Sequence, residues 1–474
     1  DSLGANVLHV GFRVNQGVYQ FQDASNSLGS FTFPTLAAYA VGLPNLFTQR
    51  VGNPWIGFPF TEWAGYIEDD WQINNRLSFS LGTRYEGQSD VADNHGWAPR
   101  LMLTWAPFGG QTLVRVGAGI FNDWLDAGSY SDTLLDNGVQ QYDVTVLDPG
   151  YPNPETSGTP RILPPSIISL APNLLLPYRE QGSVMVSRPI AGGFRLMTGY
   201  FYQRGVHELW ARNLNAPLPG TDIVPDPNEG NVDQIDSDAN SEYQALRVGF
   251  THFSPRLFFA VNYALAQSLD DTDGVLSLPA NNDDLAAEWG PSSNNATDRF
   301  FSMWNFGLTR SLRLFTMFHA QSALPYTITT SAISQNGQTN TRPTGVGRNS
   351  ALGTPQWDVD TRLSWTYAFG GAPKGTAKAN VGPGRVVRLR GPGGPPGGGG
   401  VRGHGGRGGG GGFFGGGRGA SDERYSLEFY AQAYNVFNNV NFTSFDGVLG
   451  SPLFGQPLAA EAGRRMEAGL WFRF

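Results

Sequence analysis

A strict alternation of apolar and polar side chains is the feature that most constrains what this chain can fold into, and it is clearest in residues 464–474. Successive side chains of an extended strand point to opposite faces. One face of this segment would carry Met466, Ala468, Leu470, Phe472 and Phe474, and the other Arg465, Glu467, Gly469, Trp471 and Arg473. A soluble sandwich could hold such a strand. An apolar face that ends on an aromatic carboxyl-terminal residue favours instead the closing strand of an outer-membrane β-barrel, with Phe472 and Phe474 serving membrane insertion.

Residues 76–86 and 357–369 alternate in the same way. Each segment has aromatic side chains near its ends, as the interfacial girdles of a membrane barrel require. A sandwich with one wetted face gives the same alternation. These segments alone therefore leave both architectures open.

The lengths of the connections favour the barrel. The pattern predicts about 14 strands, at 5–14, 62–73, 76–87, 97–106, 111–122, 177–188, 194–205, 241–253, 256–268, 298–310, 312–330, 356–369, 424–437 and 463–474. Tight turns at 74–75, 107–110, 189–193, 254–255 and near 311 alternate with long loops at 15–61, 123–176, 206–240, 269–297, 331–355 and 438–462, and with a shorter loop at 88–96. Membrane barrels keep short periplasmic turns and long extracellular loops, and sandwiches have no reason to keep that parity.

Composition excludes several other classes. The 474 residues contain no run of about 18 apolar residues, which excludes a helical membrane span. The chain has no Cys, and its six His residues are scattered, so we expect neither a metal site nor a cofactor. Residues 270–274 (DDTDG) resemble part of a calcium loop but lack its spaced glycine and distal Glu. We find no catalytic motif and expect no enzyme.

Residues 373–421 form a tract rich in Gly and Arg where a tight turn is expected. The tract has eight basic residues and no Asp or Glu, so the formal charge of −8 combines +8 here with −16 elsewhere. It has too little apolar surface to fold, and we expect a disordered insertion that starts from the periplasmic side. Such tracts can bind RNA. In this location we favour a neutral or lipid-contacting insertion, and we expect no nucleic-acid partner.

Alternation also predicts which side chains line the inside of the wall and which loops meet a ligand. The predicted lumen-facing residues are Arg84, Glu86, Arg115, Asp358, Asp360, Arg362, Glu428, Arg465 and Glu467. Large aromatic side chains in the predicted loops are candidates for ligand binding: Trp124, Tyr151, Trp210 and Trp289.

Several phrases, in order along nearly the whole chain, resemble the carboxyl-terminal barrel portion of TonB-dependent receptors, particularly the Oar-like group. They occupy 66–87, 97–123, 242–271, 319–330, 342–350 and 427–456, and include YIEDDWQINNRLSFSLGTRYEG, RPTGVGRNS and YNVFNNVNF. The resemblance implies a 22-stranded barrel around a plug, coupled to TonB–ExbB–ExbD through an amino-terminal part that this sequence does not contain. The tract at 373–421 departs from the family pattern, which has a short turn there.

We therefore predict an all-β segment, residues 1–474, of a barrel in the bacterial outer membrane, in contact with outer-membrane lipid. The ligand could be a siderophore, an oligosaccharide, a peptide or a protein, captured by the loops and passed through a plugged lumen. A passive porin or structural barrel is the main alternative, with an outer-membrane hydrolase and an RNA-binding protein behind it. With strands missing, the last strand would either keep an open edge or close a smaller barrel with residues 5–14.

Overall fold

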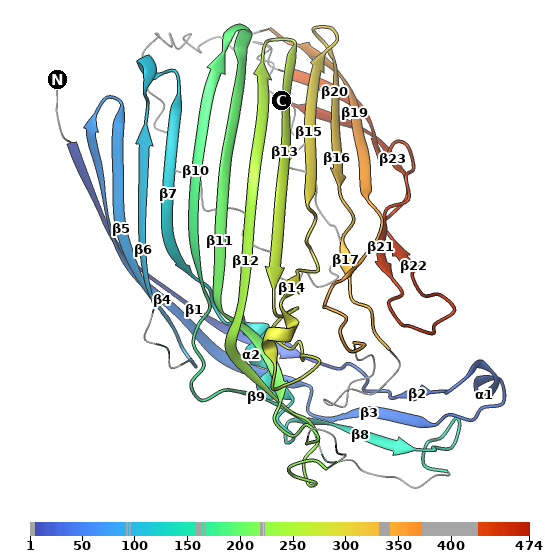
Figure 1. Cartoon of the computed structure of the whole chain (residues 1–474). Coiled ribbons are helices and arrows are strands. Elements are labelled where there is room, and N and C mark those ends of the chain that lie inside the picture. The colour runs from blue at the N-terminus through green and yellow to red at the C-terminus, as the bar shows by residue number, and fades with distance from the viewer. Residues whose placement is uncertain are drawn as a thin grey trace.

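One large curved antiparallel sheet dominates the computed structural model, which describes residues 5–91, 93, 96–156, 164, 166–218, 221, 223–330, 342–371 and 425–474 (Figure 1). Neighbouring strands along the main path of the sheet are β1 (Ala5–Gln22), β4 (Trp55–Asn74), β5 (Leu77–Gln88), β6 (Trp97–Trp105), β7 (Leu113–Asn122), β10 (Tyr178–Ile190), β11 (Phe194–Asn213), β12 (Val232–Phe253), β13 (Leu257–Asp270), β15 (Asp298–Gly307), β16 (Leu312–Gln321), β19 (Gln356–Phe369), β20 (Tyr425–Tyr434) and β23 (Arg465–Arg473). The sheet is a meander, because each strand on this path pairs with the path strands before and after it.

The predicted strands and turns are confirmed, since every strand on this path overlaps one predicted segment. The short turns lie toward the upper end of the sheet in Figure 1, where the N and C labels also lie, and the long connections lie toward the lower end. Two of the turns contain paired glycines with positive φ, Gly109 and Gly110 at 76° and 83°, and Gly192 and Gly193 at 79° and 80°. Residues with a Cβ avoid this backbone region, so the glycines let the chain reverse there. The tract at 373–421 lies outside the described residues.

Three predicted boundaries are wrong. The ladder between β1 and β4 continues to the pair Gln22–Trp55, and β11 continues to Asn213, so the loops predicted at 15–61 and 206–240 are too long. Backbone hydrogen bonding does not depend on side-chain polarity, so a ladder can continue past the end of an alternating pattern. The strand predicted at 312–330 ends at Gln321, and Pro325 pairs separately in β17, as expected for a residue that cannot donate to a ladder.

The register assigns each side chain to a face, because directly paired residues of an antiparallel ladder project to the same side. One face carries exposed apolar side chains such as Leu246, Tyr263 and Trp365, which are 46%, 39% and 44% exposed. On the opposite face, Ala245 beside Leu246 is 2% exposed. The apolar face therefore points outward, which suits a wall surrounded by lipid.

The long connections fold into a layer of their own. A second sheet, β2 (Ser30–Thr32), β3 (Leu46–Gly52) and β8 (Gln141–Leu147), extends from the lower end of the large sheet in Figure 1, and we refer to it as the loop sheet. The remaining elements are α1 (Leu36–Ala40), α2 (Ala127–Leu135), β9 (Ile167–Leu170), β14 (Gly290–Pro291), β17 (Pro325–Tyr326), β18 (Ala351–Leu352), β21 (Phe442–Phe445), β22 (Pro457–Ala460) and the 3-10 turns η1 (Phe108–Gly110), η2 (Ala191–Gly193) and η3 (Leu285–Glu288). None of the helices in the described ranges could cross a membrane.

A buried apolar cluster lies under the loops rather than between two layers of sheet. Its members are Leu125, Ala171, Leu174, Leu176, Leu209 and Ile235, and we refer to them as the loop core. Leu125 and Ile235 are fully shielded from solvent. The backbone of Leu125 is also fixed at both ends, since Gln88 donates to its carbonyl at 2.9 Å and accepts from its N–H at 3.1 Å. The loop core therefore anchors the loop layer to the end of the wall.

The large sheet does not close on itself. Within the described ranges, β1 pairs with β4 alone and β23 with β20 alone, so both strands are edges. Of the two arrangements considered from the sequence, the structure has the open edge.

Candidate functional site

The nine side chains predicted to face the lumen all lie on one face of the large sheet. Glu467 pairs with Gln432, which pairs with Arg362, and the same stepwise pairing continues across the sheet to β5. This polar face comprises Arg84, Glu86, Arg115, Asp358, Asp360, Arg362, Glu428, Arg465 and Glu467. It is opposite the apolar face described above.

Several charges on the polar face satisfy one another. Arg84 Nε lies 2.6 Å from Glu86 Oε1, and Arg362 donates to Glu428 Oε1 at 2.9 Å. The guanidinium of Arg362 also stacks over the ring of Tyr430 at 4.0 Å. Such pairs hold the charged side chains close to the wall.

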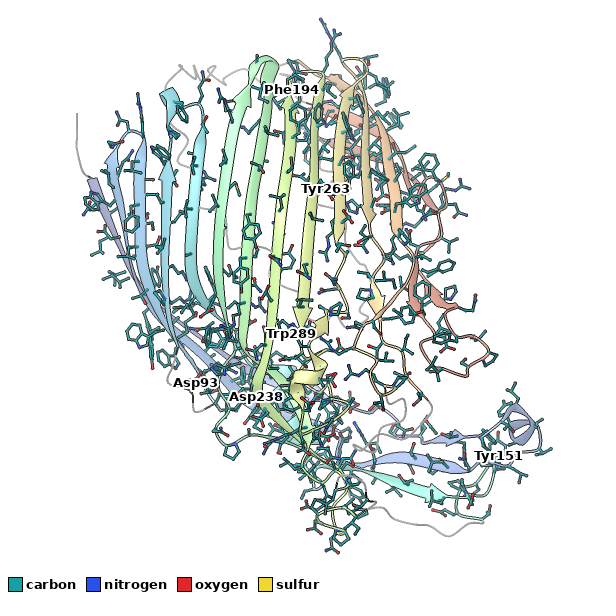
Figure 2. All side chains as sticks on the ribbon, in the orientation of Figure 1. Asp93, Tyr151, Phe194, Asp238, Tyr263 and Trp289 are labelled. Carbon is teal, nitrogen blue, oxygen red and sulfur yellow. The ribbon has the colours of Figure 1, made fainter. Side chains whose placement is uncertain are left out.

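The four aromatic residues expected to bind ligand do not form one site. Trp210 lies in β11 instead of a loop, is 3% exposed, and donates its indole N–H to Asp238. Trp124 packs against the loop core. Tyr151 and Trp289 are exposed, but Tyr151 lies on the loop sheet and Trp289 near the end of β13, far apart in Figure 2. Only these last two present large surfaces to solvent.

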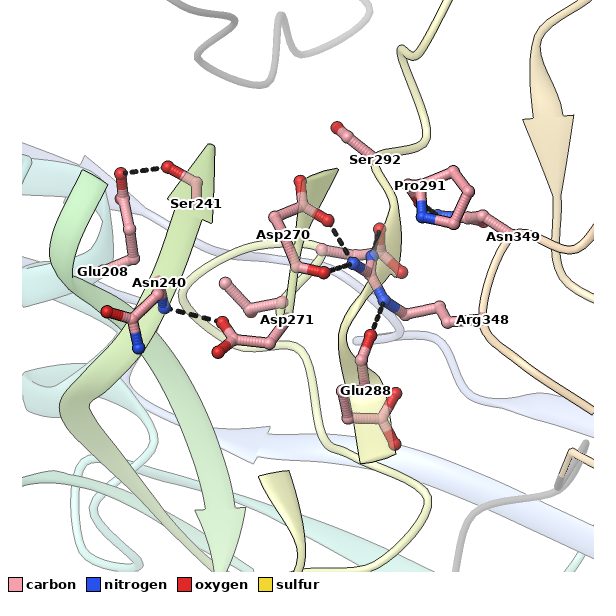
Figure 3. Close-up of polar contacts among 12 residues, drawn as sticks. Glu208, Asn240, Ser241, Asp270, Asp271, Glu288, Pro291, Ser292, Arg348 and Asn349 are labelled. Carbon is pink, nitrogen blue, oxygen red and sulfur yellow. Dashed lines mark hydrogen bonds and ion pairs between the residues drawn. The ribbon is translucent and has the colours of Figure 1, made fainter. Parts of the chain in front are cut away.

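A buried ionic network joins the loop after β13 to residues far along the chain (Figure 3). Arg348, whose side chain is 5% exposed, binds the carboxylates of Asp270 and Asp273, the second at 2.5 Å. Its Nε donates to the carbonyl of Glu288 at 3.0 Å. The DDTDG segment therefore directs two of its carboxylates to a guanidinium.

The same network extends through the side chains of Glu288 and Asn349. The Glu288 side chain binds Arg342 Nη2 at 2.5 Å and accepts from the backbone N–H of Ala280 at 2.9 Å. Asn349 donates to the carbonyl of Pro291 at 2.9 Å. Sequence reasoning did not single out Arg342 or Arg348 as site residues, although both lie in the phrase RPTGVGRNS at 342–350 that carries part of the family resemblance.

The loop sheet contains a second charged cluster, which we call the Arg50 cluster. Arg50 lies 2.7 Å from Asp23, 3.5 Å from Asp136 and 3.0 Å from Asp143. Hydrogen bonding to Asp143 and the neighbouring carboxylates raise the pKa of Arg50. Burial first, and then the nearby carboxylates, raise the pKa of Asp132 on α2 to about 6. The cluster thus has one cation for several acids, and one of those acids titrates near neutral pH.

In the part of the chain that the structure describes, no three His, Asp or Glu side chains are arranged to hold a metal ion. The polar face, the network around Arg348 and the Arg50 cluster are built from paired charges. Paired charges of this kind suit noncovalent binding and the positioning of neighbouring side chains.

These features define a class of protein, the wall and loops of a transmembrane β-barrel: an apolar face, an opposite polar face, short turns at one end and long loops at the other. The chain belongs to the outer membrane beta barrel domain family, whose model matches residues 2–96 and 91–395. It is accordingly a protein of the bacterial outer membrane. No curated protein sequence matches the chain.

Solved structures with a similar fold include outer-membrane transporters and receptors. The outer membrane transporter YddB from Escherichia coli superposes with a TM-score of 0.60 at 11% identity, over 100% of this chain and 52% of its own length. The siderophore receptor PirA from Acinetobacter baumannii gives a TM-score of 0.50 at 10% identity, over 99% of this chain and 55% of its own length. The chain thus spans about half the length of the proteins whose fold it shares.

Proposed function

We propose that this chain is part of the barrel of a TonB-dependent receptor of the Oar-like group. Its loops capture a ligand at the cell surface, and its polar face lines the path that the ligand takes through the lumen. Energy is supplied by the TonB–ExbB–ExbD machinery through a plug and a TonB box outside this sequence. The chain itself carries out no covalent chemistry.

The observation that carries the proposal is the open sheet. The edge strands β1 and β23 leave backbone N–H and C=O groups without a ladder, and hydrocarbon offers such groups no partner. The chain also spans only 52% of the length of YddB. We propose that further strands complete the barrel between these two edges, which makes the lumen wide enough to need a plug.

The polar face supports the assignment of the lumen. Nine charged residues from β5, β7, β19, β20 and β23 share it, and two of the contacts among them are ion pairs of 2.9 Å or shorter. A wall that faced lipid on both sides would bury these charges in hydrocarbon at high cost. A hydrated path on one side, where a plug or a ligand meets the wall, accommodates them.

A passive porin or a structural barrel is the second candidate, because a polar lumen and long loops serve it equally well. The two differ in their need for energy. A TonB-coupled receptor accumulates ligand only while the inner membrane is energised, whereas a porin equilibrates its solute regardless.

The test is uptake by cells that express the full-length protein. A ferric siderophore, a neutral oligosaccharide and a short peptide are supplied in turn, with and without a protonophore, and cells that lack the protein provide the baseline. The proposal expects accumulation of one of the three that the protonophore abolishes. Uptake that is unchanged by the protonophore refutes TonB coupling and favours the porin.

A further inference from the structure

Strand β8 is a free edge of the loop sheet, whose strands lie in the order β2, β3, β8 (Figure 1). Two hydrogen bonds that flank its ladder show which backbone groups face β3. Asn53 donates to the carbonyl of Gln140 at 2.8 Å, and Asp148 donates to that of Asn45 at 3.0 Å. Inward and outward groups alternate along an antiparallel strand. The residues whose N–H and C=O groups point away from β3 are therefore Gln141, Asp143, Thr145 and Leu147.

Within the described ranges, none of these outward backbone groups has a hydrogen-bond partner. An extended chain laid beside β8 would pair with them as a further strand of the loop sheet. This is the way in which peptides add to an exposed sheet edge, with main-chain hydrogen bonds for affinity and alternate side chains for specificity.

Strand β8 also lacks the features with which proteins usually block an edge. Short length, Pro, Lys and β-bulges are the common ones. The edge strand on the other side of the loop sheet, β2, has three residues, and Pro34 follows two positions after its end. β8 has seven residues, contains neither Pro nor Lys, and keeps an unbroken register with β3. It is therefore a ready template for a further strand.

One face beside this edge is acidic. Asp143 in β8 lies 3.0 Å from Arg50, and Asp23 and Asp136 lie 2.7 and 3.5 Å from the same guanidinium. With all four groups ionised the Arg50 cluster has two excess negative charges. The side chain of Asp143 is 46% exposed, so a neighbouring strand can reach it. A basic side chain on this face would offset the excess.

The opposite face beside the edge is apolar. It carries Tyr142, Val144 and Val146, and Val146 is paired with the buried Phe47 of β3. Tyr142 is 39% exposed at the end of this row. Successive side chains of an added strand fall alternately on the two faces. The edge therefore fits a strand in which apolar and basic side chains alternate.

We propose that the free edge of β8 binds an extended peptide segment as an added strand, with apolar side chains beside Val144 and a basic side chain beside Asp143. The inference rests on the proposed function of ligand capture by the loops, and it names a peptide as the chemical class of the ligand.

The test measures binding of fluorescein-labelled peptides to the full-length protein in lipid nanodiscs by fluorescence anisotropy. The probe is Val-Lys-Val-Thr-Val-Lys-Val, which presents Val on one face and Lys on the other when it is extended. The same peptide with Glu in place of both Lys residues is the charge control. The Lys peptide should bind, and it should bind more tightly than the Glu peptide.

N-methylation of the peptide tests backbone pairing without any change to the protein. The N–H groups of successive residues in an extended peptide point to opposite edges, and β8 contacts one edge only. One version is therefore methylated at the two Lys residues and another at the two inner Val residues. One of these versions should lose about ten-fold or more in affinity, because two hydrogen bonds are lost, and the other should lose less.

A pair of variants tests the same edge from the side of the protein. Thr145→Pro removes an outward N–H that takes no part in the ladder with β3, so an edge strand can accept it. It should weaken binding of the Lys peptide about five-fold or more. Thr145→Val keeps the N–H and should leave binding unchanged. If Thr145→Pro does not fold, the two methylated peptides decide the matter on the parent protein.

The proposal is overturned if the Lys peptide does not bind, if the Glu peptide binds as tightly, or if both methylated versions keep the affinity of the unmethylated peptide. It is also overturned if Thr145→Pro leaves peptide binding unchanged and instead abolishes self-association of the protein in analytical ultracentrifugation. That result would assign the edge to a second copy of the chain.

The uptake experiment with the protonophore reports on the proposed function separately. Energised uptake of a siderophore or an oligosaccharide without peptide binding refutes the peptide edge alone. Peptide binding without energised uptake refutes TonB coupling and leaves the edge of β8 as a peptide site.

Discussion

Leu125→Ala tests whether the loop core holds the loop layer on the wall. Leu125 is fully buried against Leu174, Leu176, Leu209 and Ile235. Truncating a buried Leu to Ala typically destabilises by about 2–5 kcal/mol, the loss of transfer free energy plus the cavity left behind. Because the contacts come from the connection between β7 and β10 and from the wall strands β11 and β12, which cannot easily collapse on the gap, we expect the upper part of that range, about 3–5 kcal/mol.

The loops should open locally, because the ladders of the wall do not depend on Leu125. A loss of about 3 kcal/mol raises the population of the open state about a hundred-fold. Hydrogen–deuterium exchange, followed by mass spectrometry on the protein in nanodiscs, reads this directly. Peptides that cover β9 and residues 171–176 should exchange about a hundred-fold faster, and peptides from the turn ends of β12 and β13 should not change.

Leu81→Ala is the matched control. Leu81 lies on the apolar outer face and is 54% exposed, so its truncation leaves no cavity and should not alter exchange in the loops. Equal exchange of β9 in the two variants would refute the reasoning, because it would mean that the loop core contributes nothing to holding the loops in place.

Three more predictions address the wall and the charged clusters. Leu81→Arg places a charge on the lipid face and should destabilise the barrel by about 2–4 kcal/mol in a urea titration, whereas Ser80→Arg on the neighbouring polar face should cost less than about 1 kcal/mol. The pKa of Asp132 is raised to about 6 in the folded protein, so the fold binds this proton more tightly than the unfolded chain does. The stability that the protonated carboxyl contributes is therefore fully present below about pH 4 and is lost as the pH rises through 6. Asp132→Asn should therefore slow proteolysis of the loop sheet at pH 7.5 and change nothing at pH 4. The largest loss in the free energy of unfolding on ionisation of Asp132 is about 3 kcal/mol, and solvent screening at this half-buried site makes the loss smaller. Arg348→Met leaves the partly buried carboxylate of Asp270 without its partner and should destabilise the loop by about 1–3 kcal/mol, less than for a fully buried pair because Asp270 and Asp273 keep contact with water. Faster protease cleavage at 271–289 than in the parent protein is the expected result, and equal cleavage would contradict this.

The strands and turns of the wall could be predicted from sequence because both signals are local. A period of two residues assigns Leu246 and Ala245 to opposite faces without any knowledge of their neighbours. The turn at 107–110 is recognisable from Pro and Gly within four residues. Pairing in a meander then follows from chain order, since each strand meets the next one.

The loop layer could not be predicted, because its contacts join residues that are distant in sequence. β3 pairs with β8, so residues near 50 form a ladder with residues near 143. Arg348 meets Asp270 across 78 positions. Trp210 was expected in the loop at 206–240, yet backbone pairing extends β11 past it, and its side chain is buried. No periodic pattern in the sequence reports any of these contacts.

The open edges lead to a last prediction, on how the barrel closes. Every unpaired backbone group in hydrocarbon costs several kcal/mol, so the edge strands β1 and β23 must find partners in the membrane. Either they pair with each other in a barrel of these strands alone, or further strands lie between them, as proposed above. The sequence has no Cys, so engineered pairs add the only thiols to this chain.

Cysteines at Val10 and Ile67 form the positive control, because these residues are directly paired in β1 and β4 at a Cα separation that a disulfide spans. The test pairs combine Leu470→Cys in β23 with Leu8→Cys, Val10→Cys or Phe12→Cys in β1, all on the apolar outer face. In the full-length protein we expect oxidation to cross-link the control pair and none of the test pairs, because intervening strands separate β1 from β23 by far more than the reach of a disulfide. A cross-link between β23 and β1 would mean that these strands close a barrel by themselves. Its lumen would then be narrower, and the argument for a plug, and with it for TonB coupling, would lose its main support.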